Sequence, residues 1–406
     1  MGRAFLTFAA VALVAGLPSA FAGSSADPGV TSRSILIGGT TPLSGPAQAF
    51  ASVARGADAY FKYVNARGGV HRRSIRYKYV DDGYNPAETV RKTRELVQED
   101  KVFAIFNALG TEHNLAVRPF LNEIDVPQLF AATGATTMGR DGRQYPWTIA
   151  YQPTYIAEGA MYADHIKRSR PRARIAILYQ DDDYGKDLIA GLRRGLGARA
   201  SQIVAREGHA VTDDNVQSQI AKLRGSRASV LMLFTTPKFT IQAFQYVNQL
   251  GWKPQIYVNA VSSASNIMTI SSSRGQNRRV EGAISIVFLK DPNDPKWARD
   301  PGIRLYRQIM RRHGTGNPRD VYNVYGMAVA HTFVTALRNA GRNPTRRSVM
   351  NAAMRLNNRT NPFVLPNMVI RTGGSDRFPL DQARLQRWQN GRWLSFGGLI
   401  RARSVG

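Results

Sequence analysis

Residues 102–139 read VFAIFNALGTEHNLAVRPFLNEIDVPQLFAATGATTMG, and this stretch decides the fold class. Two short apolar runs, Val102–Phe106 and Gln128–Ala131, lie on either side of a segment with the composition of a helix. Because the runs are apolar throughout and too short to be helices, they are typical of buried strands in a parallel sheet. A strand, a helix and a second strand in this order predict a right-handed βαβ unit.

Each predicted strand runs into a loop of small and hydroxyl residues: Ala108–Thr111 after the first strand and Thr133–Thr136 after the second. In an open α/β sheet, ligands bind outside the carboxyl ends of the strands, where loop N–H groups and helix N-termini point outward. Backbone amides and hydroxyl groups suit a small anionic or zwitterionic group. The two loops therefore predict a binding site, and they contain no obvious catalytic group.

The alternation of strand and helix continues on both sides of this stretch. Ile35–Gly38 and Ile75–Val80 are predicted strands before it, and a new series begins with Arg174–Tyr179 and includes the apolar Val230–Phe234. In both series each strand is followed by a short polar loop and a helix. The sequence therefore predicts an α/β fold with two Rossmann-like lobes, whose mostly parallel sheets place their binding loops across one cleft.

The first residues are typical of a secretory signal peptide. Met1–Ala22 has a single basic residue, Arg3, then an apolar run from Ala4 to Leu17 and an Ala-x-Ala cleavage pattern. The apolar run is shorter than the ~20 residues that a membrane-spanning helix needs. The chain has no Cys, which excludes a lipid-attachment cysteine, a disulfide and a reactive thiol. We expect an exported, periplasmic protein that is not lipid-anchored.

The net charge of +27 is typical of proteins that bind nucleic acid. However, Lys and Arg are scattered singly along the predicted helices and turns, without a nucleic-acid-binding motif or a long basic tail. We therefore expect no nucleic-acid partner. The basic residues are interpreted either as a generally solvated surface or as a surface that attracts acidic partners.

Sequence motifs of common enzymes are missing. There is no Gly-x-Ser-x-Gly elbow, no His-Glu-x-x-His and no phosphate-binding Gly-x-x-x-x-Gly-Lys. Thr111, Glu112 and His113 are adjacent, but at the start of a helix their side chains point in different directions. The His residues have no metal-ligand spacing, and Asp181–Asp183 fits a helix cap better than a calcium loop. We expect no catalytic residue, no cofactor and no metal.

The motifs, in their order and spacing, resemble the periplasmic type I solute-binding proteins of branched-chain amino acid ABC transporters. They are the signal peptide, IGGTTPLSGP at 37–46, the loops at Gly110-Thr111 and Thr133–Thr136, YQDDDYG at 179–185, GWKP at 251–254 and NVYG at 323–326. The resemblance extends from about Ser32 to Phe396. It implies two lobes that are joined by three crossings and close on a ligand like a hinged clamp.

The resemblance also implies where the lobes begin and end. The first lobe would comprise residues 30–150 and 282–360, and the second lobe residues 151–281 and 361–400. The crossings are expected near Ala150–Pro153, Val280–Gly282 and Arg359–Pro362.

The resemblance further implies a ligand-binding site between the lobes. Loops 109–111 and 134–136 would hold the ligand carboxylate through backbone and hydroxyl groups. Tyr184 of the second lobe would cover the ligand. Ser44 and Gly45 would lie close to the ligand, because their side chains are small. The predicted ligand-binding residues are Ser44, Leu109, Gly110, Thr111, Gly134, Ala135, Thr136, Tyr155, Tyr184, Thr235, Thr236, Asn259 and Ala260.

One departure from the family concerns charge. Amino-acid-binding members have a carboxylate after the strand that matches Ile256–Asn259, where it pairs with the ligand ammonium, but the loop here is Asn259–Ser262 and has no acid. An ammonium buried without a counter-charge costs several kcal/mol. Either Asp181–Asp183 supplies the charge, or the ligand is an aromatic or aliphatic carboxylate without an ammonium, which we favour. Its apolar walls would be Phe50, Tyr84, Tyr155 and Tyr184.

The expected partners follow from the same resemblance. They are a small-molecule ligand, an amino acid or a small carboxylate, and the permease subunits of an ABC transporter, which would recognise the closed form of a monomer. The sequence does not separate this role from a signalling role, in which the same clamp delivers its ligand to a receptor. A secreted enzyme is the least favoured alternative.

Overall fold

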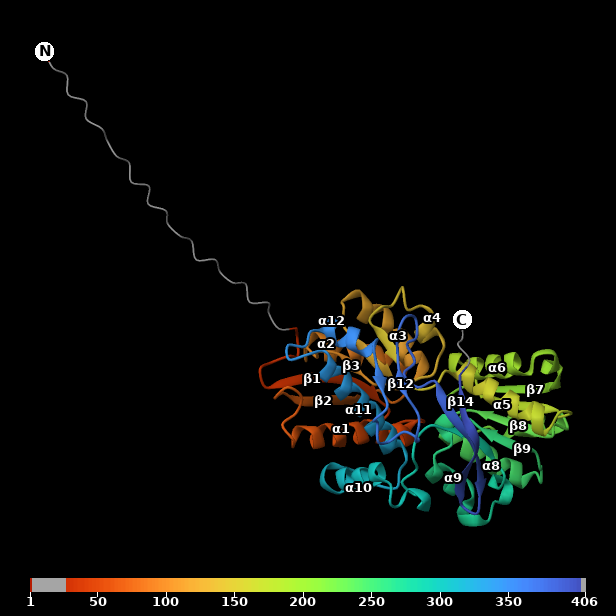
Figure 1. Ribbon diagram of the computed structural model, residues 1–406. Coiled ribbons are helices and arrows are strands. Elements are labelled where there is room, and N and C mark those ends of the chain that lie inside the picture. Colours follow the sequence, from red (N-terminus) through yellow and green to blue (C-terminus); the bar gives the residue numbers. More distant parts are fainter. Residues whose placement is uncertain (2–26, 403–406) are drawn as a thin grey trace.

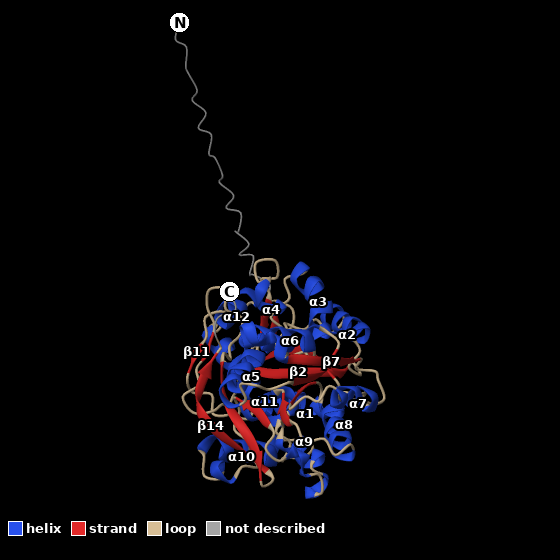
Figure 2. Ribbon diagram, turned by 90° about the vertical axis from the view of Figure 1, so that its right-hand side faces the viewer, coloured by secondary structure: helices blue, strands red, loops and turns tan. Residues whose placement is uncertain are grey.

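The computed structural model describes residue 1 and residues 27–402, so the predicted signal peptide, apart from Met1, lies outside the described residues. The described chain folds into two α/β lobes that lie side by side (Figure 1). This confirms the predicted fold class. Figure 2 shows that helices cover the sheets on their outer faces.

The two lobes are built on two separate sheets. The first sheet has five parallel strands in the order β2-β1-β3-β4-β5, and the second has seven in the order β14-β13-β10-β9-β8-β6-β7. The strands are β1 (Ser34–Thr41), β2 (Ser74–Asp81), β3 (Ile105–Phe106), β4 (Gln128–Ala131), β5 (Thr148–Ala150), β6 (Ile175–Gln180), β7 (Ile203–His209), β8 (Val230–Phe234), β9 (Gln255–Val258), β10 (Ile284–Val287), β13 (Gln382–Gln389) and β14 (Arg392–Arg401), with a small separate pair of β11 (Asn357–Asn358) and β12 (Ile370–Arg371).

Helices follow most strands, as the alternation predicts. Those of the first lobe are α1 (Ala51–Asn65), α2 (Pro86–Gln98), α3 (Thr111–Glu123), α4 (Thr137–Arg140), α10 (Pro301–His313), α11 (Tyr322–Asn339) and α12 (Arg346–Ala353). Those of the second lobe are α5 (Tyr155–Ser169), α6 (Asp183–Leu196), α7 (Gln217–Gly225), α8 (Pro237–Gln249) and α9 (Ser265–Ser271).

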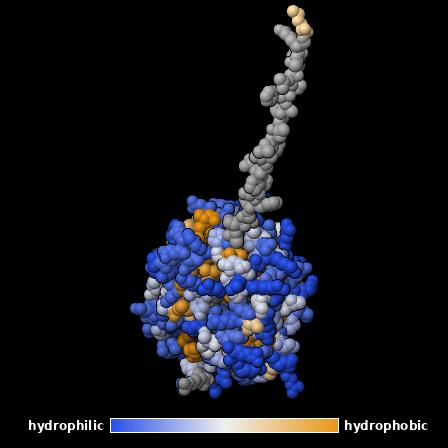
Figure 3. Space-filling view, turned by 90° about the vertical axis from the view of Figure 1, so that its left-hand side faces the viewer, coloured by the Kyte–Doolittle hydropathy of each residue, from blue (hydrophilic) through white to orange (hydrophobic). Residues whose placement is uncertain are grey.

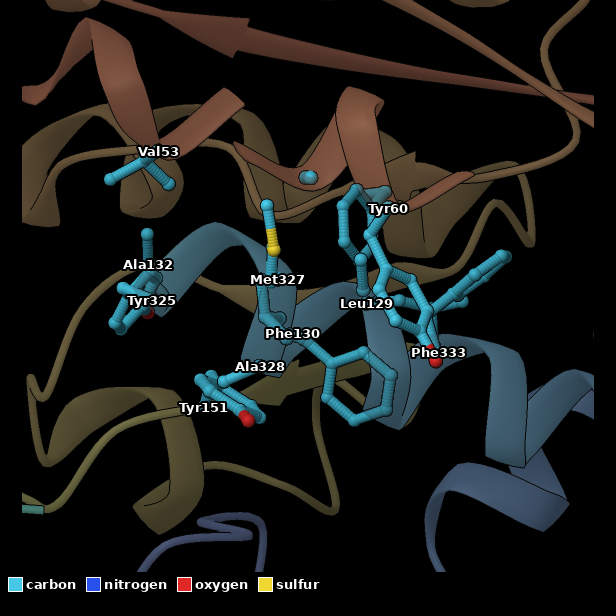
Figure 4. Packing of buried hydrophobic residues seen from close by; sticks show 14 of the residues in the cluster. Val53, Tyr60, Leu129, Phe130, Ala132, Tyr151, Tyr325, Met327, Ala328 and Phe333 are labelled. Atoms are coloured by element: carbon cyan, nitrogen blue, oxygen red, sulfur yellow. The ribbon is translucent and has the colours of Figure 1, made fainter. Parts of the chain in front are cut away.

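Helix α11 forms the centre of the first lobe, and its N-terminal turns border the space between the lobes. It packs directly on α1, because Gly56 and Gly326 let the two backbones meet: a Cβ on Gly326 would lie 2.0 Å from the Val53 carbonyl oxygen. Further along α11, the ring of Phe333 contacts Phe106 with centroids 5.2 Å apart. The close-up in Figure 4 shows this packing between α1 and the sheet.

One predicted strand is shorter than expected. Val102–Phe106 was expected to be a strand, but only Ile105–Phe106 pairs as β3, although the whole segment is buried. The Phe103 N–H donates to the Leu36 carbonyl at 2.7 Å, and the Arg346 guanidinium donates to the carbonyls of Val102 and Phe103. A side chain from a distant helix therefore satisfies backbone groups that a strand ladder would otherwise use.

The chain passes between the lobes three times, but two of the expected crossing points are wrong. Residues 284–287 pair as β10 with β9 and β13 of the second sheet, so the second crossing comes after Val287 and not at 280–282. The third crossing comes near residue 381 and not at 359–362, because Phe363 and Ile370 are buried in the core of the first lobe. Local sequence patterns contain no signal for either of these long-range contacts.

The outer face of the first lobe is largely hydrophilic, with only scattered apolar patches (Figure 3). Among the described residues, no helix is both long enough and apolar enough to cross a membrane.

Candidate functional site

A cavity lies between the two lobes and contains about 970 Å³ of empty space, part of which is open to solvent. The predicted site residues that line it are Leu109, Gly110, Thr111, Tyr155, Tyr184, Thr236 and Ala260. Two of the predicted aromatic wall residues, Phe50 and Tyr84, line it as well.

Three predicted residues do not line the cavity, and each has a polar atom that bonds another group. The Ser44 hydroxyl donates to Asp81 Oδ2 at 2.6 Å. The Thr136 N–H donates to Asp187 Oδ2 at 2.7 Å. Thr235 Oγ1 lies 2.6 Å from His209 Nε2. The sequence shows that these groups are polar, but it does not show their partners.

The remaining predicted residues lie behind the wall of the cavity. Gly134 and Ala135 are covered by Tyr155, whose N–H donates to the Gly134 carbonyl at 2.9 Å. Asn259 lies behind Tyr184, with its side-chain amide 2.6 Å from the Tyr184 hydroxyl. When the Asn259 oxygen accepts from that hydroxyl, the Asn259 nitrogen donates to the backbone carbonyls of Leu233 and Thr235, and both ends of the amide are satisfied. These residues support the wall and do not form it.

The N-terminus of α3 opens into the cavity. Its N-cap residue, Gly110, has φ 114° and no side chain that could cap the helix, and a Cβ there would lie 2.2 Å from His113 Nδ1. The N–H groups of the first turn of a helix have no partner within the helix and carry a partial positive charge. Because Gly110 and Thr111 both line the cavity, this end of the helix is placed to receive an anionic group.

Two side chains support the presence of a ligand here, because their polar atoms are buried without a partner. The hydroxyl groups of Thr236 and Tyr325 have no hydrogen-bond partner in the described part of the chain, and their residues are 2% and 7% exposed. Both residues line the cavity. A buried hydroxyl without a partner costs about 1–3 kcal/mol, which a ligand acceptor would recover. Tyr325, Val53 and Ala132 meet at one end of α11 in Figure 4.

Aromatic rings form the cavity wall near the N-terminus of α3. Tyr155 and Tyr184 meet edge to face with centroids 4.9 Å apart, and Tyr84 lies against the buried His113 at 4.2 Å. Burial raises the pKa of Tyr155 to about 12, so its hydroxyl is neutral at ordinary pH and can act as a donor. The Thr111 hydroxyl lies 2.7 Å from that of Thr133.

The acidic groups near the cavity are not those considered from the sequence. Within Asp181–Asp183, Asp181 pairs with Lys186 at 3.1 Å, Asp182 caps α6 through the Gly185 N–H, and none of the three lines the cavity. Glu158 lies behind the wall and accepts from the Ala260 N–H at 2.6 Å and from the Tyr162 hydroxyl at 2.7 Å. Its burial raises its pKa to about 7.

Asp291 is the charged residue that lines the cavity in the described part of the chain, and the sequence did not indicate it. It follows the second crossing and accepts from the Asn293 N–H at 2.8 Å. Burial raises the pKa of its carboxyl group. Other lining residues that sequence reasoning missed are Ile286–Leu289, Tyr322 and Trp393. These segments are distant in the chain and meet only at the hinge, so no local motif marks them.

Among the described residues, no group of three or more His, Asp or Glu side chains is arranged to hold a metal ion.

The sequence model of the Periplasmic binding protein family matches residues 34–392. The chain belongs to this family. The match confirms the resemblance that the motifs indicated. The family consists of binding proteins, in agreement with a cavity whose lining contains hydroxyl groups, backbone amides and a single carboxylate.

Relatives with curated names show moderate identity. The chain is 27% identical over 350 residues to Leu/Ile/Val-binding protein homolog 1 of Brucella abortus (strain 2308). The alignment covers 83% of this chain and 84% of the relative. The chain spans only about half the length of two others: 53% of Leu/Ile/Val-binding protein homolog 3 of Brucella melitensis and 52% of an amino acid binding protein of Pseudomonas aeruginosa, each 22% identical.

Solved structures share the fold over nearly the whole length. A branched-chain amino acid ABC transporter protein from Thermus thermophilus with bound valine has a TM-score of 0.81 at 18% identity, covering 92% of this chain and 97% of that one. A fatty acid ABC transporter substrate-binding protein from Thermomonospora curvata has a TM-score of 0.75 at 20% identity, covering 93% and 94%. At these identities the likeness shows the two-lobed fold alone.

Proposed function

We propose that this protein is an extracytoplasmic solute-binding protein, which captures a small carboxylate between its lobes and delivers it to the permease of an ABC transporter. The observation that carries the proposal is the open N-terminus of α3, which faces a mostly apolar cavity between the lobes. Gly110 and Thr111 bring this helix end to the cavity wall, and the unpartnered hydroxyls of Thr236 and Tyr325 add donors. Neutral donors of this kind bind an anion without a buried counter-ion.

The names of the relatives suggest a branched-chain amino acid, but the surroundings of the helix end favour a carboxylate without an ammonium group. The loop at 259–262 has no acid, and Glu158 behind it already accepts two hydrogen bonds. Because its pKa is raised by burial, Glu158 is a weaker counter-charge than an ordinary carboxylate. An α-ammonium at the α3 end would therefore lose its hydration without a matching gain.

Contacts between the lobes support a clamp that closes on its ligand. The Glu112 carboxylate of α3 accepts from the Asp183 N–H of α6 at 3.0 Å, and the Asp187 carboxylate of α6 accepts from the Thr136 N–H next to α4 at 2.7 Å. A carboxylate of each lobe thus caps the start of a helix in the other lobe. Near the hinge, the Tyr322 hydroxyl donates to the Val261 carbonyl at 2.8 Å. The closed form would be the one that a permease recognises.

The proposed location and state are periplasmic and monomeric. The signal-peptide pattern of Met1–Ala22 and the absence of Cys support an exported protein without a lipid anchor. The family description agrees with a periplasmic site of action.

A thermal-shift screen of the mature protein, refolded to remove any carried-over ligand, tests this function. The panel pairs leucine, valine and phenylalanine with the carboxylates that lack their amino group. A specific ligand raises the melting temperature by mass action. We expect stabilisation by one or more of the plain carboxylates. Stabilisation by the amino acids alone would contradict the absence of ammonium recognition, and no response to either group would contradict carboxylate capture.

A further inference from the structure

The cavity continues well beyond the N-terminus of α3. Its head, at Thr111, Tyr155 and Tyr184, contains the donors described above. The lining also includes the second crossing, Ile286–Leu289, and Asp291. A small carboxylate at the head would leave this long extension empty.

Hydrogen bonds show which part of the crossing lies near the head. The Ile286 N–H donates to the Tyr162 hydroxyl at 3.3 Å, and that hydroxyl donates to Glu158 at 2.7 Å. Glu158 in turn accepts from the N–H of Ala260, a cavity residue next to Asn259, which supports Tyr184. Ile286 therefore lies at the head side of the cavity.

Other hydrogen bonds place Asp291 at the far end. Asn293 donates its backbone N–H to Asp291, and its side-chain nitrogen donates to the Ser265 hydroxyl at 3.0 Å. Ser265 also lines the cavity, at the N-terminus of α9. The backbone from Ile286 to Asp291 is largely extended, at about 3.3 Å per residue, which gives an upper limit of about 16 Å between the two ends. This upper limit is longer than a leucine side chain.

The walls between the two ends are apolar. Phe50 and Tyr322 of the first lobe meet edge to face with centroids 5.0 Å apart, and the Tyr322 hydroxyl is used by Val261 of the second lobe. Phe288 and Leu289 line the same passage from the crossing. An extended hydrocarbon chain would bury its surface here without leaving a polar group unpaired. The Asp291 carboxylate at the far end, by contrast, favours a ligand that ends in a hydrogen-bond donor over one that ends in a methyl group.

We propose that the ligand is an elongated carboxylate, whose head binds at the α3 N-terminus, whose apolar body lies along Ile286–Leu289, and whose far end donates a hydrogen bond to Asp291. This inference rests on the proposed function, because it uses the same carboxylate head site. It names a ligand class with a polar group at both ends, such as an ω-hydroxy carboxylate.

Isothermal titration with a series of unbranched carboxylates tests the length of the site. Pentanoate, octanoate and undecanoate are compared with leucine on the refolded protein. Affinity is expected to rise about threefold to fourfold for each methylene group that the passage buries. Equal affinity for all three acids would overturn the elongated ligand and leave carboxylate capture standing. Binding of none of them, with no binding of leucine, would overturn the proposed function itself.

The ω-hydroxy forms of the same acids test the far end. At the length that fits best, the ω-hydroxy form is expected to bind about tenfold more tightly than the plain acid, as for a hydrogen bond to a charged group. The variant Asp291→Leu, checked for an unchanged unfolding transition, should lose this preference. A wild-type protein that prefers the plain acid at every length, or a preference that survives in Asp291→Leu, would overturn the role of Asp291.

A variant that narrows the passage provides the steric control. Ala264 lines the cavity next to Ser265. Ala264→Leu is expected to lower the affinity for undecanoate at least about tenfold more than the affinity for pentanoate, because only the longer chain reaches this position. An equal loss for both acids would contradict a chain that extends toward Asp291.

Discussion

Thr235 and Thr236 are neighbours, but among the described residues only the Thr235 hydroxyl has a hydrogen-bond partner. Variants of the two residues can therefore distinguish an effect on stability from an effect on ligand binding. Thr235 Oγ1 lies 2.6 Å from His209 Nε2, whereas Thr236 Oγ1 is buried at the cavity without a partner. We predict that Thr236→Val leaves the free energy of unfolding of the ligand-free protein unchanged or raises it by about 1 kcal/mol, because it removes an unpaired polar atom. The same change should weaken ligand binding about tenfold.

Thr235→Val is the matched control for this experiment. It breaks an existing hydrogen bond and leaves His209 Nε2 without a partner, so it should lower the free energy of unfolding by about 1–3 kcal/mol with little effect on affinity. Chemical denaturation measures the first quantity, and titration with the ligand measures the second. If both variants behaved alike in both measurements, the Thr236 hydroxyl would not be a ligand donor.

Glu158 makes the stability of the protein depend on pH. Burial raises its pKa from an ordinary 4.5 to about 7, so the folded protein holds a proton that the unfolded chain has lost over this pH range. Stability from this group is full below pH ~4.5 and is lost as the pH rises through about 7, which amounts to about 3 kcal/mol. Glu158→Gln keeps an oxygen acceptor for Ala260 and Tyr162, and it should be less sensitive to pH.

The measurement is the difference in melting temperature between wild type and Glu158→Gln at pH ~5 and pH ~8. Because other acids titrate equally in both proteins, the difference isolates Glu158. The melting temperature of the variant should rise relative to that of the wild type as the pH rises. A constant difference across this range would show that Glu158 has an ordinary pKa in the folded protein.

At the scale of elements, α6 of the second lobe is joined to α3 and to the start of α4 in the first lobe by reciprocal caps across the cleft. Glu112 accepts from the Asp183 N–H, and Asp187 accepts from the Thr136 N–H. We expect both bonds to break when the lobes separate. We predict that Glu112→Gln combined with Asp187→Asn lowers ligand affinity about threefold to thirtyfold, the equivalent of one or two hydrogen bonds to charged groups at a partly exposed site.

The control for the caps lies on the same helix. Asp182 caps α6 from within its own lobe through the Gly185 N–H at 3.2 Å. Asp182→Ala should lower the free energy of unfolding by about 1 kcal/mol, as the loss of an N-cap does, with a smaller effect on affinity. If the double variant lowered stability as Asp182→Ala does and left affinity unchanged, the caps across the cleft would not contribute to closure.

The elements that the sequence predicted well are those set by local patterns. Val230–Phe234 and Gln128–Ala131 are strands with the expected bounds, since an unbroken apolar run between polar loops needs no other information. The hairpin of β13 and β14 turns at Asn390-Gly391, whose φ angles of 51° and 73° suit those two residue types. The shortening of β3 was missed because Arg346, far along the chain, binds the carbonyl groups of Val102 and Phe103, which come just before it.

The whole molecule determines the part of the site that the sequence missed. The head of the cavity uses residues directly after strands, which sequence patterns mark, and several of the predicted ones line it. Its long wall needs the crossing after β10, the first turns of α11 and the loop around Ala264 in one place. That meeting depends on the paths of the crossings, two of which were predicted wrongly, so no sequence motif could have indicated Asp291 as a lining residue.

Closure of the whole molecule is the event on which delivery of the ligand depends. Among the described residues, the polar contacts between the lobes include the two caps at the rim, the Tyr322–Val261 hydrogen bond near the hinge and the Asn266–Asp320 hydrogen bond at 3.3 Å, and apolar side chains of both lobes also pack in one cluster. A ligand that touches both lobes adds contacts that favour the closed form over the open one. We predict that small-angle scattering shows a smaller radius of gyration for the refolded protein with a bound carboxylate than without it.

The variants of the caps make this scattering experiment specific to the clamp. The double variant Glu112→Gln and Asp187→Asn should be as open as the wild type without ligand, and should need a higher ligand concentration to contract. At saturating ligand both proteins should reach the same radius, because the ligand contacts remain. A bound ligand that causes no contraction in the wild type would contradict a hinged clamp, since the two lobes would then already hold their closed arrangement without it.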